Sequence, residues 1–228
     1  ADLVITVDPV NDAPVASGTI ADQSDDDAGV VAGVATSSFF SDIDGDVLGY
    51  SASGLPAGLS IDPVTGVISG TIDNSASQGG PASDGVYSVT VTADDGNGGT
   101  VDQTFTWTVA NPAPVANDDA ASTDEDVAVS GNVIGSGGAG DVADSDADGD
   151  VLSVTTFVVA GDPATYNAGD TATIAGVGTV LLASDGSYTF TPDADWNGTV
   201  PAITYTLSDG EGGSDTADLV ITVDPVND

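Results

Sequence analysis

Apolar and polar residues alternate in several short segments of the chain. In 87–92 the apolar residues Tyr, Val and Val take turns with Ser and Thr, and the same alternation recurs in 104–109 and 203–208. A period of two predicts strands with one buried face. Runs rich in Asp and Gly follow, DDGNGG at 94–99 and DGEGG at 209–213, where they predict hairpin turns.

The composition extends this prediction to the whole chain. Thirty Gly, eleven Pro and many Val and Thr disfavour helix and favour strands. Hydrophobic residues make up 40% of the sequence, which is enough for a buried core. Two domains of about 100 residues with many short strands are typical of β-sandwiches. The predicted fold class is therefore all-β, with two tandem β-sandwich domains.

An internal repeat sets the domain boundaries. Residues 1–12 and 217–228 share the sequence ADLVITVDPVND at all twelve positions, which indicates a tandem array in a longer natural protein. A Pro-rich linker at 111–114 resembles the linker at 8–14. We therefore predict four parts: the last strand and linker of a preceding repeat at 1–12, domains at 13–111 and 112–224, and a linker to the next repeat at 225–228.

The first strand of the chain lacks the domain to which it would belong. Leu3, Ile5 and Val7 give residues 1–7 an apolar face. An unpaired strand of this kind tends to pair with another chain. We expect it to be disordered or to pack against a neighbouring molecule.

The charge of the chain is extreme. It carries 37 acidic residues and no Lys, Arg or His, for a formal net charge of −37. Self-repulsion of this size opposes compaction, so folding requires cations from outside. Binding to nucleic acid or to an anionic membrane is excluded, because both depend on basic residues. The absence of Cys excludes disulfides and thiolate metal sites.

Two acidic clusters offer oxygen ligands for such a cation. They contain Asp42, Asp44 and Asp46 in the first domain, and Asp144, Asp146, Asp148 and Asp150 in the second. Ca²⁺ takes 6–8 oxygen ligands, and alternate Asp residues with a Gly can fold around one ion. The alternative is a solvated polar turn. For Asp94, Asp95 and Asp209, a ligand role and simple hairpin chemistry both stay open.

The second cluster resembles the first half of an EF-hand loop but lacks its second half. The twelfth position is Thr155 instead of a bidentate Glu, and the segment after the cluster predicts a strand. We therefore do not expect an EF-hand.

Several motifs resemble known families. The linker DPVND at 8–12 is similar to the calcium-binding linker of cadherins, and the Asp clusters and the ADDG turn at 93–96 resemble the other calcium elements of that family. Residues 13–111, with SDIDGD at 41–46 and TGVISGT at 65–71, resemble dystroglycan-type cadherin-like domains. Residues 112–224, with ANDD at 116–119 and SYTFTPD at 187–193, resemble bacterial cadherin-like repeats of the VCBS type.

The resemblance implies Ig-like or cadherin-like sandwiches with Ca²⁺ at the junctions. At the first junction it implies the ligands Asp8, Asn11, Asp12, Asp44, Asp46 and Asp94 or Asp95. The linker at 111–114 lacks the Asp of the cadherin pattern, so the middle junction would use Asn117, Asp118 and Asp119 with Asp146, Asp148, Asp150 and Asp209. Asp224, Asn227 and Asp228 would serve a following unit.

Such repeats occur in giant RTX-type adhesins that Gram-negative bacteria export by type I secretion. The resemblance therefore implies a calcium-rigidified extender that projects a distal binding region from the cell surface for adhesion or biofilm formation. Its partners would be the neighbouring repeats of the same chain. The alternative function is a carbohydrate- or protein-binding module. We do not expect an enzyme, because no carboxylate pair stands apart from the metal clusters and His, Lys, Arg and Cys are absent.

Overall fold

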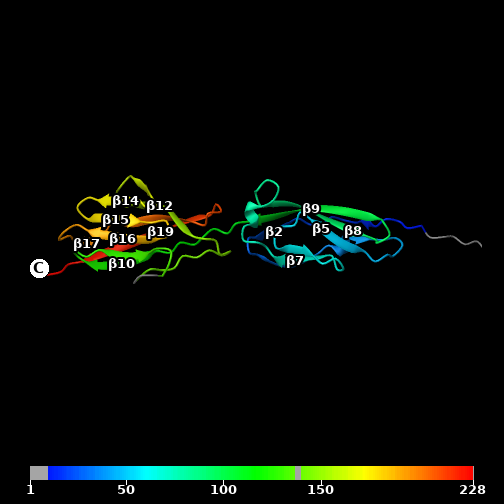
Figure 1. Ribbon diagram of the computed structural model, residues 1–228, viewed down its shortest axis with the longest axis horizontal. Helices are drawn as coiled ribbons and strands as arrows, with labels where there is room; N and C mark the ends of the chain where they lie inside the picture. The colour runs from blue at the N-terminus through cyan, green and yellow to red at the C-terminus, as the bar shows by residue number, and fades with distance from the viewer. Residues whose placement is uncertain (1–9, 137–139, 228) are drawn as a thin grey trace, which may run out of the picture. The chain divides into compact units, whose positions relative to one another are not determined.

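The computed structural model describes residues 10–136 and 140–227, in which the chain forms two compact β-rich units (Figure 1). The units are Ala1–Ala110 and Asn111–Asp228. Among the described residues, the helical segments are two 3-10 turns, η1 (Ser37–Phe39) and η2 (Ala76–Gln78). The structure confirms the all-β prediction. The prediction for the strand at 1–7 lies outside the described residues.

The first unit contains two main sheets. Its strands are β1 (Val15–Ala16), β2 (Gln23–Asp26), β3 (Val30–Ala35), β4 (Phe40–Ser41), β5 (Gly49–Ser53), β6 (Leu59–Ile61), β7 (Val67–Thr71), β8 (Val86–Asp94) and β9 (Thr100–Ala110). One sheet has the order β2-β9-β8-β5 and the other β3-β7-β6, while β1 pairs with β4. The predicted hairpin is present as β8 and β9, in which Tyr87 lies opposite Trp107.

The core of the first unit follows the predicted alternation. Val89, Val91 and Trp107 are completely buried, and Ile68 from the second sheet joins them. The indole N–H of Trp107 donates to Asp25 Oδ2 at 2.9 Å, so the one polar atom of this ring has a partner.

The second unit repeats the plan with its own sheets. Its strands are β10 (Asp119–Asp124), β11 (Val129–Asn132), β12 (Ser153–Val159), β13 (Thr165–Asn167), β14 (Thr171–Ile174), β15 (Gly178–Leu182), β16 (Ser187–Pro192), β17 (Gly198–Thr199), β18 (Ile203–Ser208) and β19 (Ser214–Asp224). One sheet has the order β10-β19-β18-β12-β13, with β17 paired to β19, and the other β11-β16-β15-β14. Phe157, Phe190, Tyr205 and Leu219 are buried between the sheets.

One glycine of the second unit lies inside a strand. Gly131 and Asn132 end β11, where they pair with Tyr188 and Ser187. A Cβ atom at Gly131 would come within 2.5 Å of the Tyr188 hydroxyl. The absence of a side chain therefore lets the tyrosine ring cross this strand.

Strand register brings each acidic loop beside a hairpin turn. The loop at 42–46 lies between β4 and β5, and β5 pairs with β8 so that Gly49 lies opposite Asp94, next to the turn at 94–99. In the second unit, β12 follows the loop at 144–150 and pairs Ser153 with Ser208, next to the turn at 209–213. A strand after the second cluster agrees with the expectation that it is not an EF-hand.

Candidate metal centres

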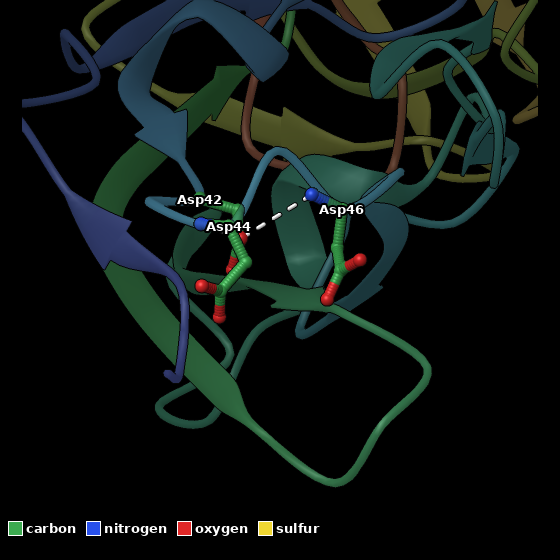
Figure 2. Close-up of side chains that lie close together, drawn as sticks. All are labelled: Asp42, Asp44 and Asp46. Atoms are coloured by element: carbon green, nitrogen blue, oxygen red, sulfur yellow. Dashed lines mark hydrogen bonds between the residues drawn. The ribbon is translucent and has the colours of Figure 1, made fainter. Parts of the chain in front are cut away.

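The first acidic loop folds around one carboxylate. The Asp42 Oδ1 atom accepts the backbone N–H groups of Asp44 at 2.8 Å and of Asp46 at 3.3 Å. Gly45 allows the sharp turn with φ +79°. One ligand atom each from Asp42, Asp44 and Asp46 lies within 4.8 Å of the others, and Figure 2 shows the three side chains in one small loop. This spacing suits a single cation held by oxygen atoms.

The linker and the hairpin turn of the same unit join this loop. The Asn11 side-chain amide donates to Asp95 Oδ2 at 2.9 Å, and the backbone N–H of Asp12 donates to Asp44 Oδ2 at 2.7 Å. The Asn97 side-chain amide donates to Asp46 Oδ2 at 2.9 Å. Linker, loop and turn therefore meet within one unit.

Asp95 is the turn residue that faces inward. Its Oδ1 atom accepts the backbone N–H groups of Asn97 at 2.7 Å and Gly99 at 2.9 Å, and it is buried. The hydrogen bond from the Asn11 amide is the main cause that holds the pKa of Asp95 below its usual range. Burial acts in the opposite direction, and the backbone donors lower the pKa further. Asp94 is exposed and caps the N–H of Gly96. Of the two alternatives at this turn, Asp95 is the one that the linker contacts.

The second unit has the same construction. Asp146 Oδ1 accepts the N–H groups of Asp148 at 3.1 Å and Gly149 at 3.2 Å, and Gly149 has φ +89°. The Asn111 side-chain amide donates to Asp209 Oδ2 at 2.8 Å. Asp209 Oδ1 accepts the N–H groups of Glu211 and Gly213 at 2.8 and 3.0 Å, as Asp95 does in the first unit.

Several carboxylate oxygens in the two loops are enclosed without a hydrogen-bond donor. They are Asp42 Oδ2, Asp146 Oδ2 and both oxygens of Asp148. Burial first, and then the neighbouring Asp146 and Asp150, raise the pKa of Asp148 to about 7. An enclosed carboxylate without a partner is costly, and a bound cation removes that cost. The donor set of hard oxygen atoms fits Ca²⁺.

Asp118, Asp119 and Asp144 each accept a backbone hydrogen bond within the second unit. Asp118 is exposed and accepts the N–H of Asp218 at 2.9 Å. Asp119 is 2% exposed and accepts the N–H of Val142 at 2.7 Å. Asp144 accepts the N–H of Asn117 at 2.7 Å, and the amide of Asn117 donates to the carbonyl of Ala143. These groups bond to neighbouring strands and loops of their own unit.

The Tyr205 hydroxyl lies at the centre of that network. It is 3.0 Å from the Asn117 carbonyl, 3.2 Å from Asp144 Oδ2 and 3.4 Å from Asp119 Oδ2. Burial is the main cause that raises the pKa of Asp119, to about 6, and it also raises the pKa of Asp144. The network fixes the start of the loop at 144–150 against the core.

Two further acidic residues, Asp27 and Glu125, were not predicted from the sequence as site residues. The N–H of Asp27 donates to the carbonyl of Ala110, the last residue of β9, and the N–H of Glu125 donates to that of Asp224, the last residue of β19, both at 2.9 Å. Asp27 is 4% exposed and its Oδ2 atom has no donor. Glu125 Oε1 accepts the N–H of Val226 in the linker at 2.6 Å.

Asp27 and Glu125 are equivalent acids at the end of each unit remote from its acidic loop. A residue with positive φ follows each of them, Ala28 at 56° and Asp126 at 64°. Each acid directly follows the last residue of an edge strand, β2 or β10. This position can be recognised only when the parallel pairing of those strands is known. Asp224 and Asn227 are exposed at this end of the second unit, while Asp8 and Asp228 lie outside the described residues.

Comparisons with known proteins find one matching family model in each unit. Residues 111–225 match the family model "Bacterial cadherin-like domain", and residues 13–110 match the model "Putative Ig domain". No curated protein matches the chain. In the described residues, no helix has the length and apolar character needed to cross a membrane.

Three solved structures illustrate the likeness. Drosophila N-cadherin EC1-4 is 17% identical over 93% of this chain and 50% of its own, with a TM-score of 0.40. Human protocadherin-24 EC1-2 is 20% identical over 96% of this chain and 100% of its own, with a TM-score of 0.38. An endo-fucoidan hydrolase of glycoside hydrolase family 107 is 19% identical over 97% of this chain, with a TM-score of 0.41, and the chain covers 30% of that protein.

Scores of this size support no functional argument, so the hydrolase gives no reason to assign catalysis. Cadherin-like and Ig-like domains are typically non-enzymatic, and cadherin-like domains are of extracellular type. The family model of the second unit matches half of the sequence. The chain belongs to the bacterial cadherin-like domain family, and residues 13–110 of its first unit match the Putative Ig domain model.

Proposed function

We propose that this chain is a calcium-rigidified extender segment of a bacterial surface adhesin. The observation that carries the proposal is the pair of matched loops, in which a linker Asn bonds to the turn Asp beside an Asp-x-Asp-Gly-Asp loop. Each loop holds carboxylate oxygens that no protein donor reaches. Because the sequence contains no basic residue, cations from solution are the available counter-charges.

The residues that would hold Ca²⁺ follow from these contacts. In the first unit they are Asp42, Asp44, Asp46 and Asp95 with the linker residues Asn11 and Asp12. In the second unit they are Asp146, Asp148, Asp150 and Asp209 with Asn111. Ca²⁺ would neutralise the carboxylates and fix each linker to the domain that follows it.

A spacer role suits this chemistry. Linkers that contain Pro are already semi-rigid, and a cation shared by linker and loop removes the remaining freedom. Extracellular calcium modules have dissociation constants of about 10⁻⁴ to 10⁻³ M, so the sites would be filled outside the cell. We further propose an RTX-type adhesin exported by type I secretion as the context, with neighbouring repeats of the same chain as partners.

Calcium titration of the full chain tests the proposal. We expect isothermal calorimetry to detect binding, a higher melting temperature in Ca²⁺ than in EDTA, and a narrower distribution of particle dimensions by small-angle scattering. The variant Asp42→Asn/Asp146→Asn should lose most of the heat of binding. An identical melt and scattering curve in Ca²⁺ and EDTA would refute the proposal. A glycan array tests the alternative, a carbohydrate-binding module.

A further inference from the structure

The two loops differ at two positions that supply hydrogen-bond donors in the first unit. Asn11 and Asn111 make the same contact, which aligns Asp12 with Pro112. The N–H of Asp12 donates to Asp44 Oδ2 at 2.7 Å. Proline has no N–H, so the residue equivalent to Asp44, which is Asp148, receives no linker donor. Both of its oxygens are enclosed and accept no hydrogen bond.

The second difference lies in the hairpin turn. Asn97 and Glu211 hold the same place, since their N–H groups donate to Asp95 Oδ1 and Asp209 Oδ1. The side-chain amide of Asn97 donates to Asp46 Oδ2 at 2.9 Å. Glu211 is half-buried and brings a carboxylate where the first unit has an amide donor. The second loop therefore gains a negative charge at the position where the first loop gains an N–H.

We propose that Pro112 and Glu211 make the second loop a tighter divalent-cation site, which fills before the first loop and which its unit needs in order to stay folded. The inference rests on the proposed calcium function and deepens it. In the first loop, the N–H groups of Asp12 and Asn97 already donate to the carboxylates of Asp44 and Asp46. Removal of the cation therefore leaves fewer carboxylate oxygens without a partner. In the second loop, the cation has no protein donor to replace it at Asp148.

The Asp12 side chain is the main opposing contribution, since it can add a carboxylate to the first site. It is exposed, whereas Glu211 is half-buried. A carboxylate in contact with water keeps its solvation and is screened, so it strengthens cation binding less than one withdrawn from water. With Asp12 and Glu211 included, each loop has the same number of carboxylates. The two additional hydrogen-bond donors of the first loop therefore decide which loop binds the cation more tightly.

Residue-resolved nuclear magnetic resonance on the full chain tests this order. Amide signals of Gly45 and Gly99 report the first loop, and those of Gly149 and Gly213 report the second. During titration of the calcium-free protein with CaCl₂, we expect the second pair to reach half-change at a free Ca²⁺ concentration about tenfold lower than the first, which corresponds to about 1.4 kcal/mol. Equal midpoints, or an earlier change at the first loop, overturn the inference.

Reciprocal variants identify the cause. Pro112→Ala/Glu211→Asn should raise the midpoint of the second loop toward that of the first, while Asn97→Glu should lower the midpoint of the first loop. Glu211→Gln keeps the shape of the side chain and serves if the double variant loses its dispersed spectrum. Unchanged midpoints in these variants overturn the assignment to Pro112 and Glu211. If neither loop responds to millimolar Ca²⁺, the proposed function itself fails, which is a distinct outcome from equal midpoints.

Discussion

Replacing Asp148 by Asn should change the stability of the second unit in opposite directions with and without Ca²⁺. Both oxygens of Asp148 are enclosed and accept no hydrogen bond, and Asp146 and Asp150 lie beside it in the loop. Without a cation, the variant removes an unpaired charge. With Ca²⁺ bound, the same variant removes a charged ligand.

The raised pKa of Asp148 sets the size of the first effect. Burial and the two neighbouring carboxylates raise this pKa from 3.8 to about 7. The folded state then binds the proton more tightly than the unfolded chain, so stability falls as the pH rises from about 4 to about 7 and levels off above that range. A shift of this size costs at most about 4 kcal/mol. Screening by solvent reduces the expected gain in the variant to about 1–2 kcal/mol.

Ligand linkage sets the size of the second effect. At a Ca²⁺ concentration one hundred times the dissociation constant, binding stabilises the folded state by about 3 kcal/mol. Loss of the Asp148 carboxylate should remove most of this contribution. The predicted difference between the two conditions is therefore several kcal/mol, with a change of sign.

Hydrogen exchange measured by mass spectrometry can follow each unit separately in the full chain. Trypsin has no cleavage site, because Lys and Arg are absent, but pepsin can release peptides from β15–β16 and from β8–β9. At about pH 7.5, where Asp148 is ionised, β15–β16 should exchange more slowly in the variant than in the wild type in EDTA, and faster in Ca²⁺. Peptides from β8–β9 should not change.

A matched control separates this effect from general relief of charge. Asp124 is an exposed carboxylate of the same unit, at the opposite end of β10 from Asp119. Asp124→Asn should shift exchange by less than about 0.5 kcal/mol in both conditions. The reasoning is refuted if Asp148→Asn destabilises the second unit in EDTA, or if both conditions give the same sign.

Three further predictions concern single contacts. In EDTA, Asp119 should contribute a fall in the melting temperature of the second unit between about pH 4 and pH 6, because burial raises the pKa of Asp119 to about 6; Asp119→Asn should remove this part of the profile and leave the fall from Asp148, which extends to about pH 7. Asp95→Ala, which removes an acceptor of three hydrogen bonds, should destabilise the first unit by about 2–4 kcal/mol in calorimetry, and a loss of under about 1 kcal/mol would contradict the role of that turn. Trp107→Phe should cost about 2–4 kcal/mol in denaturant unfolding of the first unit alone, since it opens space in a fully buried site and leaves Asp25 without its donor.

The sequence allowed prediction of the hairpins and of the acidic loops. Period-two alternation in 87–92 and 203–208 correctly predicted the buried faces of β8 and β18, because a strand in a sandwich buries every second side chain. The loop at 42–46 was predicted from Asp spacing alone, and the structure places its ligand atoms within reach of one ion. Local chemistry was sufficient for these features, since each is formed by residues close together in sequence.

Only the tertiary structure decided which acidic residues act together. Parallel pairing of β2 with β9 and of β10 with β19 places Asp27 and Glu125 at the ends of strands that are distant in sequence. Burial distinguishes Asp95 from Asp94 and withdraws Asp119 into a tyrosine network. The missing N–H of Pro112 also matters only because the structure shows the equivalent N–H, that of Asp12, donating to Asp44. Charge and strand pattern are properties of the sequence, whereas the partner and the solvation of each carboxylate depend on long-range contacts.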